Sequence, residues 1–168
     1  MPCSAAPFGI YLHIPYCPAK CRYCDFFSRP GCRAVPQDYC DALLRELRKN
    51  TRRPNTLYFG GGTPALLSPA QAAALIEAAN PLPGAEITLE ANPDVVTPET
   101  LKGFRAAGVT RISFGVQSAD DAQLRRLGRT HTAAGAAQAL DWAVQAGFDE
   151  ICGDIMLALP GYSNAEFD

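Results

Sequence analysis

The chain has 168 residues, of which 48% are hydrophobic and 19% charged, a composition typical of one globular domain with a buried core. Its formal net charge of -2 lacks the basic excess of a nucleic-acid-binding protein, and no apolar run approaches the roughly 20 residues of a membrane span. The N-terminal segment shows no secretory signal, so we expect the 7 cysteines to be reduced thiols in the cytoplasm. That setting favours metal or redox chemistry over disulfides.

Strand and helix patterns alternate along the whole chain. We expect strands at residues 9–14, 56–59, 86–91, 110–116 and 150–159, and helices at 36–49, 69–80, 98–108, 121–127 and 132–147. Ser163 and Glu166 have the spacing of a capping box, which predicts that a sixth helix begins there. Such alternation is typical of a parallel sheet with right-handed crossovers.

The expected strands are apolar on one face and polar on the other. Tyr11 and His13 share the polar face of the first strand, and Glu90, Ser113 and Asp154 lie on the polar faces of later strands. Parallel strands that are buried on both faces usually read as continuous apolar runs instead. The fold class we predict is therefore α/β, a partial (β/α) barrel of about five strands with a polar interior. Barrel enzymes carry their sites at the C-terminal ends of the strands.

Three cysteines follow the first strand directly, in the spacing C-x3-C-x2-C. They are Cys17, Cys21 and Cys24, and such soft ligands favour zinc, copper(I) or an iron–sulfur cluster. A four-iron cluster normally takes four cysteines, so three would leave one iron without a protein ligand. A structural zinc site made of these cysteines and His13 is the alternative, and the spacing alone leaves both open.

Further candidate residues lie where the later strands end. Three consecutive glycines in the segment 60–64 favour close approach of a ligand, although a plain turn would also use them. Glu90 lies on the polar face of its strand, where a carboxylate needs a partner or a ligand, and Asp154 interrupts an apolar strand. Gln117 could bind a ligand or merely form a hydrogen bond at the strand end. Arg129 could bind a ligand or merely be a solvated surface charge.

The remaining histidine and cysteines are expected to be structural. His131 precedes a helix and is expected to start it or to pack against it rather than to bind a metal. Cys3, Cys32, Cys40 and Cys152 are expected to behave as ordinary buried or surface thiols, because free cysteine packs as a small apolar residue.

Taken together and in order, these motifs resemble the radical S-adenosylmethionine (SAM) superfamily. More narrowly, the chain is similar to the group that contains oxygen-independent coproporphyrinogen III oxidase and the heme chaperone HemW. The resemblance extends from about residue 9 to the C-terminus. It is carried by the motifs YLHIPYC (11–17), GGGTP (60–64), EANP (90–93), GVQS (115–118), LGRTH (127–131), GDIM (153–156) and LPG (159–161), with Cys21 and Cys24.

The resemblance implies roles for these residues. Cys17, Cys21 and Cys24 would hold a [4Fe-4S] cluster whose open iron chelates SAM, which makes zinc the weaker reading. Tyr11 and the turn Gly61-Gly62-Thr63 would bind the methionine part of SAM, and Glu90, Gln117, Arg129 and Asp154 would contact SAM from successive strands. A low-potential electron donor, such as a flavodoxin or ferredoxin, is also implied. The resemblance assigns no catalytic residue.

One position separates the two branches of that group. The resembled oxidase has a further cysteine two residues after the third cluster cysteine, whereas this chain has Phe26 there. The Cys-Asp-Phe form is similar to HemW, which implies a heme or porphyrin ligand and transfer of heme to an accepting protein. The other branch implies an enzyme that decarboxylates the propionate side chains of coproporphyrinogen by a 5'-deoxyadenosyl radical. Chaperone and enzyme both stay open, as does a structural metal-binding module.

The resembled proteins continue beyond the last residue of this chain. A sixth strand and a C-terminal domain follow the fifth strand in them. We therefore expect residues 1–168 to be an incomplete radical SAM core domain. The fifth strand would then be an open apolar edge, which favours aggregation.

Overall fold

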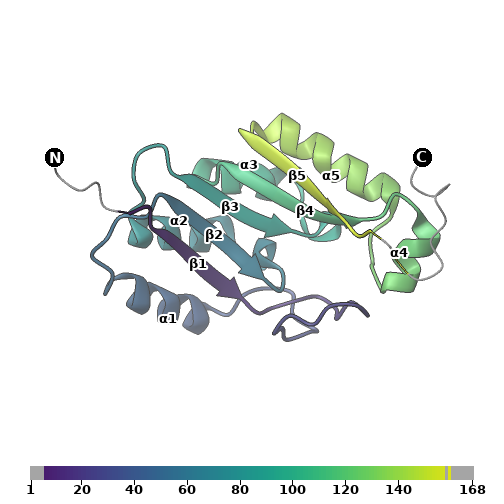
Figure 1. The fold of residues 1–168 in the computed structure, drawn as a ribbon, viewed down its shortest axis with the longest axis horizontal. Helices are drawn as coiled ribbons and strands as arrows, with labels where there is room; N and C mark the ends of the chain where they lie inside the picture. Colours follow the sequence, from purple (N-terminus) through teal and green to yellow (C-terminus); the bar gives the residue numbers. More distant parts are fainter. Residues whose placement is uncertain (1–5, 158, 160–168) are drawn as a thin grey trace.

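Five parallel strands form one sheet in the computed structural model, which describes residues 6–157 and 159. The strands are β1 (Gly9–Ile14), β2 (Thr56–Gly61), β3 (Glu86–Ala91), β4 (Arg111–Gln117) and β5 (Glu150–Ile155). Each strand pairs with the next one along the chain, so their order in space is β1-β2-β3-β4-β5 (Figure 1). This sequential order is that of a partial (β/α) barrel, and it confirms the predicted fold class.

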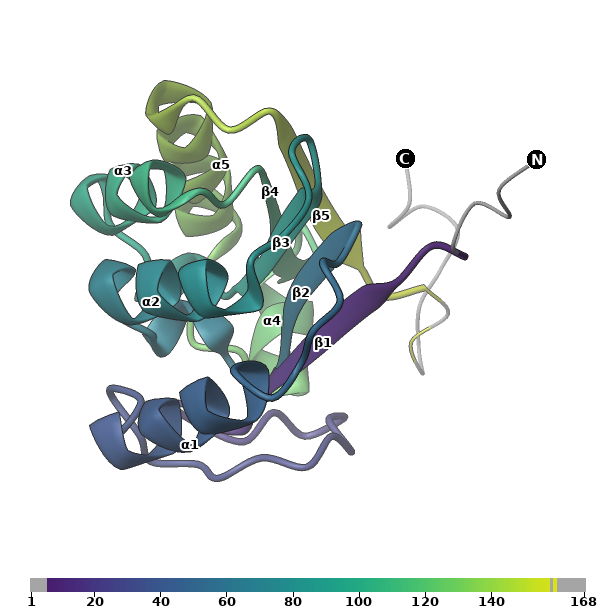
Figure 2. The same ribbon diagram turned by 90° about the vertical axis from the view of Figure 1, so that its left-hand side faces the viewer.

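Four longer helices lie on one face of the sheet (Figure 2). They are α1 (Gln37–Leu47), α2 (Pro69–Ala79), α3 (Pro98–Ala107) and α5 (Ala133–Ala146), and the short α4 (Asp121–Leu127) precedes α5. Two single turns of 3₁₀ helix, Pro64–Leu66 and Pro93–Val95, follow β2 and β3. Within the described part of the chain, no helix is both long enough and apolar enough to span a membrane.

Local signals set where the helices begin and end. Ser68 and Thr97 each form a capping box with the residue three positions later, and a proline occupies the first turn of both helices. Gly108 and Gly147 adopt left-handed conformations that end α3 and α5. These are the positions at which the sequence predicted the boundaries.

The core lies between the sheet and the helices. Phe59, Phe104 and Phe114 are among its largest fully buried side chains, and they join strands β2 and β4 to helix α3. The opposite face of the sheet carries the polar residues of every strand. The strand register aligns Tyr11, Tyr58, Thr88, Arg111 and Glu150 across all five strands. The predicted division into an apolar and a polar face is therefore correct.

The fifth strand is shorter than predicted. It ends at Ile155 rather than at residue 159, and its last pair is with Gln117 of β4. The pairing is irregular between Gly115 and Gln117, and Gln117 has a positive φ of 67°. β4 itself ends at Gln117, so the pairing stops soon after this bulge, with Met156 N–H still donating to Gln117 O at 3.0 Å. The sixth helix predicted from residue 163 lies outside the described residues.

Candidate functional site

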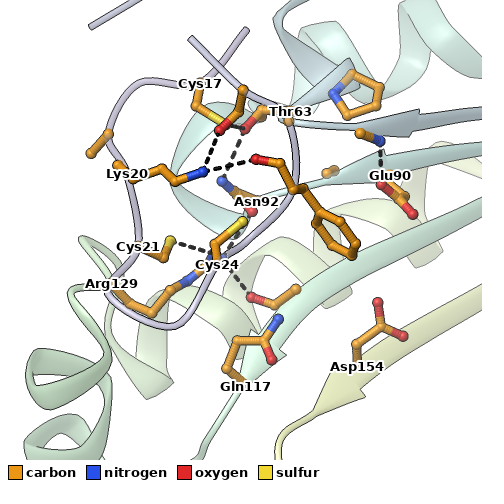
Figure 3. Close-up of a pocket in the computed structure, with 18 of the residues that line it drawn as sticks. Cys17, Lys20, Cys21, Cys24, Thr63, Glu90, Asn92, Gln117, Arg129 and Asp154 are labelled. Atoms are coloured by element: carbon orange, nitrogen blue, oxygen red, sulfur yellow. Dashed lines mark hydrogen bonds between the residues drawn. The ribbon is translucent and has the colours of Figure 1, made fainter. Parts of the chain in front are cut away.

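A cavity of about 140 Å³ opens at the C-terminal ends of the strands. The loop after β1 forms one side of it, and the ends of β2, β3, β4 and β5 form the other (Figure 3). Every predicted site residue except Tyr11 lines this cavity. These lining residues are Cys17, Cys21, Cys24, Gly61, Gly62, Thr63, Glu90, Gln117, Arg129 and Asp154. Residues spread over more than 130 positions of sequence therefore meet at one place.

Tyr11 lies outside the cavity lining. Its ring stacks on that of Tyr58 with centroids 6.0 Å apart, and its hydroxyl is 3.1 Å from Nδ1 of His13. In the sheet register Tyr11 is level with Thr88, two residues before Glu90. The backbone of Tyr11 is therefore one pleat further from the strand ends than Glu90, and its predicted contact with SAM stays a prediction.

The cysteine loop is held by backbone hydrogen bonds at both of its sides. Cys17 N–H donates to Arg29 O at 3.0 Å, and Cys32 N–H donates to Cys17 O at 2.9 Å. Arg22 N–H donates to Leu127 O at 3.0 Å, which ties the loop to the end of α4. Burial raises the pKa of the Cys17 thiol, although the hydroxyls of Thr63 and of Ser28 act in the opposite direction.

The loop can approach β2 only because residue 62 is glycine. A Cβ at Gly62 would lie 2.8 Å from Tyr16 O, 2.9 Å from Cys17 Sγ and 3.0 Å from Ile14 O. Two of these neighbours are backbone oxygens, which have little freedom to move away. Gly61 has a φ of +122°, a conformation that other residues rarely adopt. The glycine turn therefore places the first cysteine against the strand end, and the close approach of a ligand to this turn stays a prediction.

The donor set suits a cluster better than a single zinc ion. Both ring nitrogens of His13 are engaged, Nδ1 with the Tyr11 hydroxyl and Nε2 with Phe27 O at 2.9 Å. Among the described residues, no three His, Cys, Asp or Glu side chains gather closely enough to hold one metal ion. Three thiols that instead surround a cavity fit a larger inorganic group with soft ligands.

Glu90 anchors the glycine turn. Its Oε1 accepts from the Tyr58 hydroxyl at 2.8 Å, and its Oε2 accepts from Gly61 N–H at 3.1 Å. Burial and the Glu90 carboxylate both raise the pKa of Tyr58, so that phenol stays a donor. Glu90 thus accepts hydrogen bonds from two neutral donors and borders the cavity. A purely structural role would instead pair this carboxylate with a neighbouring cation.

Arg129 is fixed by three acceptors rather than solvated. Its Nη2 donates to Gly115 O at 2.6 Å and to Asn92 Oδ1 at 2.9 Å, and its Nη1 donates to Cys21 Sγ at 3.5 Å. A Cβ at Gly115 would lie 3.2 Å from Arg129 Nη2, so the glycine leaves room for the guanidinium. The guanidinium reaches the cavity from the turn between α4 and α5.

The far side of the cavity belongs to β4 and β5. Asp154 accepts from Ser113 Oγ, which is 3.3 Å from each carboxylate oxygen. The left-handed backbone of Gln117 sits at the bulge, and its Nε2 lies 3.0 Å from where a Cβ of Gly115 would be. Strained backbone of this kind persists only when its surroundings hold it, and it gathers at functional sites.

Two of the cavity residues that were not predicted as site residues make hydrogen bonds that hold the site together. Asn92 links Thr63 to Arg129, and the signal for it was its place on the polar face of the third strand, two residues after Glu90. Lys20 donates from Nζ to Phe26 O at 2.8 Å and to Ser28 Oγ at 3.0 Å, which closes the cysteine loop. No pattern in the sequence distinguishes Lys20 from a solvated lysine.

Comparison with known proteins identifies the family. The sequence profile of the radical SAM superfamily matches residues 11–168. The chain belongs to the radical SAM superfamily. It is 39% identical to the heme chaperone HemW of Haemophilus influenzae and 42% identical to that of Escherichia coli, in both cases over 95% of this chain and 45% of the relative. It is 42% identical to the bovine mitochondrial radical SAM domain-containing protein 1, over 90% of this chain and 36% of that protein.

Solved structures agree with this assignment. Coproporphyrinogen III oxidase (HemN) from Escherichia coli superposes with a TM-score of 0.81 at 28% identity, over 96% of this chain and 39% of that one. Methylornithine synthase, at 14% identity and a TM-score of 0.57, shares the fold alone. The chain thus spans less than half the length of these relatives. Membership of the superfamily implies a [4Fe-4S] cluster and SAM as cofactors, in agreement with the sequence prediction.

Proposed function

We propose that this chain is the cofactor-binding part of a heme-binding radical SAM protein that passes heme to an accepting protein. The feature that carries the proposal is Phe26, which borders the cavity where the oxidase branch is expected to have a cysteine. Its side chain is 68% exposed and is free to meet a flat apolar ligand. The identity of about 40% to proteins named heme chaperone supports the same choice.

The cofactors are assigned to the residues around the cavity. Cys17, Cys21 and Cys24 hold the [4Fe-4S] cluster, because they are the thiols that surround the cavity. The glycine turn at 61–63 offers SAM a close backbone approach, and Glu90, Gln117, Arg129 and Asp154 supply charges and amides around it. When bound, a reduced cluster of this type supplies the electron that cleaves SAM into methionine and a 5'-deoxyadenosyl radical.

Further partners follow from this proposal. Reduction of the cluster requires a low-potential electron donor such as a flavodoxin or ferredoxin, and the delivery of heme requires an accepting protein. The cytoplasm remains the predicted compartment, although the bovine relative is named as mitochondrial. We also propose that residues 1–168 are an incomplete radical SAM core domain, which lacks the sixth strand and the C-terminal domain of the complete protein.

The cofactor assignment is tested by anaerobic reconstitution with iron and sulfide, followed by electron paramagnetic resonance with and without SAM. We expect a [4Fe-4S] signal that changes when SAM is added, since three cysteines leave one iron open. The matched control is Cys32→Ser, which keeps the cavity thiols, against Cys24→Ser, which removes one. A zinc-loaded chain without iron or sulfide would instead support a structural metal-binding module.

Heme titration distinguishes the chaperone from the oxidase. We expect saturable binding with a shift of the Soret band, and we expect Phe26→Ser to weaken it while Phe8→Ser, distant from the cavity, leaves it unchanged. The second candidate is an oxygen-independent coproporphyrinogen oxidase, which the superposition on HemN favours. Decarboxylation of coproporphyrinogen III by the chain, or by a longer protein that contains it, would replace the chaperone with the enzyme.

A further inference from the structure

Asn92 stands at the centre of a hydrogen-bonded chain that joins two of the three cavity thiols (Figure 3). On one side its amide contacts Thr63 Oγ1 at 3.3 Å, and that hydroxyl contacts Cys17 Sγ at 3.4 Å. On the other side it contacts Arg129 Nη2 at 2.9 Å, and Nη1 of the same guanidinium contacts Cys21 Sγ at 3.5 Å. A single amide thus connects the two thiols through one hydroxyl and one guanidinium.

The direction of every bond in this chain is fixed by the arginine. A guanidinium has donors only, so the group that faces Arg129 must be the Oδ1 of Asn92. The Nδ2 of Asn92 then faces Thr63 and donates to its hydroxyl oxygen. That hydroxyl is 1% exposed, and with one lone pair taken it directs its own proton to Cys17 Sγ. Both sulfur atoms therefore accept a hydrogen bond. For Cys17, Asn92 determines that the Thr63 hydroxyl donates its proton to the sulfur.

We propose that Asn92 is a positioning residue that fixes one hydrogen bond to each of Cys17 and Cys21, and thereby raises the reduction potential of the cluster that they hold. The inference rests on the cluster of the proposed function, but not on heme binding. Hydrogen bonds to ligating sulfurs withdraw electron density and stabilise the more negative, reduced cluster. Aspartate at this position would accept from Arg129 but could not donate to Thr63.

The test is a redox titration of the reconstituted chain with four variants. Asn92→Leu breaks the chain on both sides, Thr63→Val removes only the hydroxyl, and Thr63→Ser keeps it. We expect Thr63→Val to lower the ratio of reduced to oxidised cluster at a fixed potential roughly fivefold, which is about 40 mV for a one-electron couple. Thr63→Ser should restore the wild-type potential, and Asn92→Leu should lower the potential at least as far as Thr63→Val. Thr51→Val, an exposed threonine before β2, is the matched control and should change nothing.

A second measurement needs no cluster. In a double-mutant cycle on the apo chain, the effects of Thr63→Val and Asn92→Leu on the unfolding equilibrium constant should combine to less than their product, because both break the same hydrogen bond. Independent effects in this cycle would overturn the chain of hydrogen bonds. Unchanged potentials in cluster-loaded variants would overturn the tuning role alone. A wild-type chain that binds no cluster would overturn the proposed cofactor assignment, and the cycle would still decide the hydrogen bonding.

Discussion

At the scale of single residues, the site depends on glycines whose missing side chains leave room for thiols and backbone. Gly62→Ala would place a Cβ 2.8 Å from Tyr16 O and 2.9 Å from Cys17 Sγ. We expect the variant to lose about 1–3 kcal/mol of stability, the usual effect of forced overpacking, and to bind little iron. Urea unfolding and iron analysis after reconstitution measure the two effects.

Gly135→Ala is the matched control for that substitution. Gly135 lies in the first turns of α5, and its Cβ would meet only the Thr132 side chain, at 3.3 Å. Alanine is the better helix former by up to about 1 kcal/mol, so this variant should be as stable as the wild type or more so. Equal iron binding by Gly62→Ala and Gly135→Ala would contradict the close approach of the loop to β2.

Glu90 offers a test of whether its charge or its shape holds the glycine turn. Glu90→Ala leaves the Gly61 N–H and the Tyr58 hydroxyl without their acceptor, and an unpaired group of this kind costs about 1–3 kcal/mol. Glu90→Gln keeps one oxygen for Gly61, and the Tyr58 hydroxyl can accept from the new amide, so it should cost less. Thermal unfolding of both variants measures this order. A glutamine variant as unstable as the alanine variant would show that the charge itself is required.

The sequence identified most of these residues but not how they act. Glycine spacing and the polar face of the third strand were enough to favour Gly61 and Glu90 as ligand contacts, whereas Arg129 was selected only through the family resemblance. Asn92 was missed as a site residue because its role depends on side chains from two other segments, which no local pattern reveals. Tyr11 was selected through the motif, and in the sheet register it lies level with Tyr58 rather than in the cavity lining, so its contact with SAM stays a prediction.

At the scale of elements, the turn between α4 and α5 carries a buried histidine. His131 is 7% exposed, its Nε2 lies 3.0 Å from Val116 O, and its buried Nδ1 has no hydrogen-bond partner among the described residues. Since a carbonyl accepts, Nε2 must carry the proton, and any further proton would have to enter at Nδ1. Burial therefore lowers the pKa of His131 below its usual 6.5, and the carbonyl of Val116 opposes this only partly. The prediction that His131 packs beside the helix start is confirmed.

This histidine makes the fold sensitive to acid. A lowered pKa in the folded state means that the unfolded chain binds the proton more readily, so stability is fully present above pH 6.5 and is lost as the pH falls through the folded-state pKa. We expect the free energy of unfolding to fall between neutral pH and mildly acidic pH. His131→Gln, which can still donate to Val116 O, should flatten that slope. Parallel slopes for wild type and variant in urea titrations would contradict the prediction.

The end of β5 illustrates that the boundary of a strand can depend on tertiary structure. The apolar pattern continues to residue 159, and the pattern alone predicted that the strand does too. The strand stops at Ile155, where its partner β4 ends at Gln117 just after an irregular pairing. A bulge depends on how two strands meet at the cavity, and neither strand encodes it alone. The helix boundaries were easier to predict because their caps are local.

At the scale of the whole molecule, all four longer helices cover the same face of the sheet (Figure 2). The order of strands follows the order of the chain, which alternation of strand and helix made predictable. The polar face and the cavity remain uncovered by helices in the described part of the chain. The cavity's size and the contacts within it could not be predicted, because they arise from side chains of six separate segments.

The last prediction concerns the edge of this sheet. β5 is the terminal strand in the described sheet, and it leaves Ile155 59% and Leu157 65% exposed. An exposed strand edge with apolar side chains is a template for pairing with another copy, so we expect association that increases with concentration. Ile155→Lys should reduce it, because a charge on an edge strand opposes pairing. Val144→Lys, at a residue that is 67% exposed on helix α5, is the matched control and should leave association unchanged. Sedimentation velocity measures both, and a wild-type chain that stays monomeric at every concentration would refute the role of the edge.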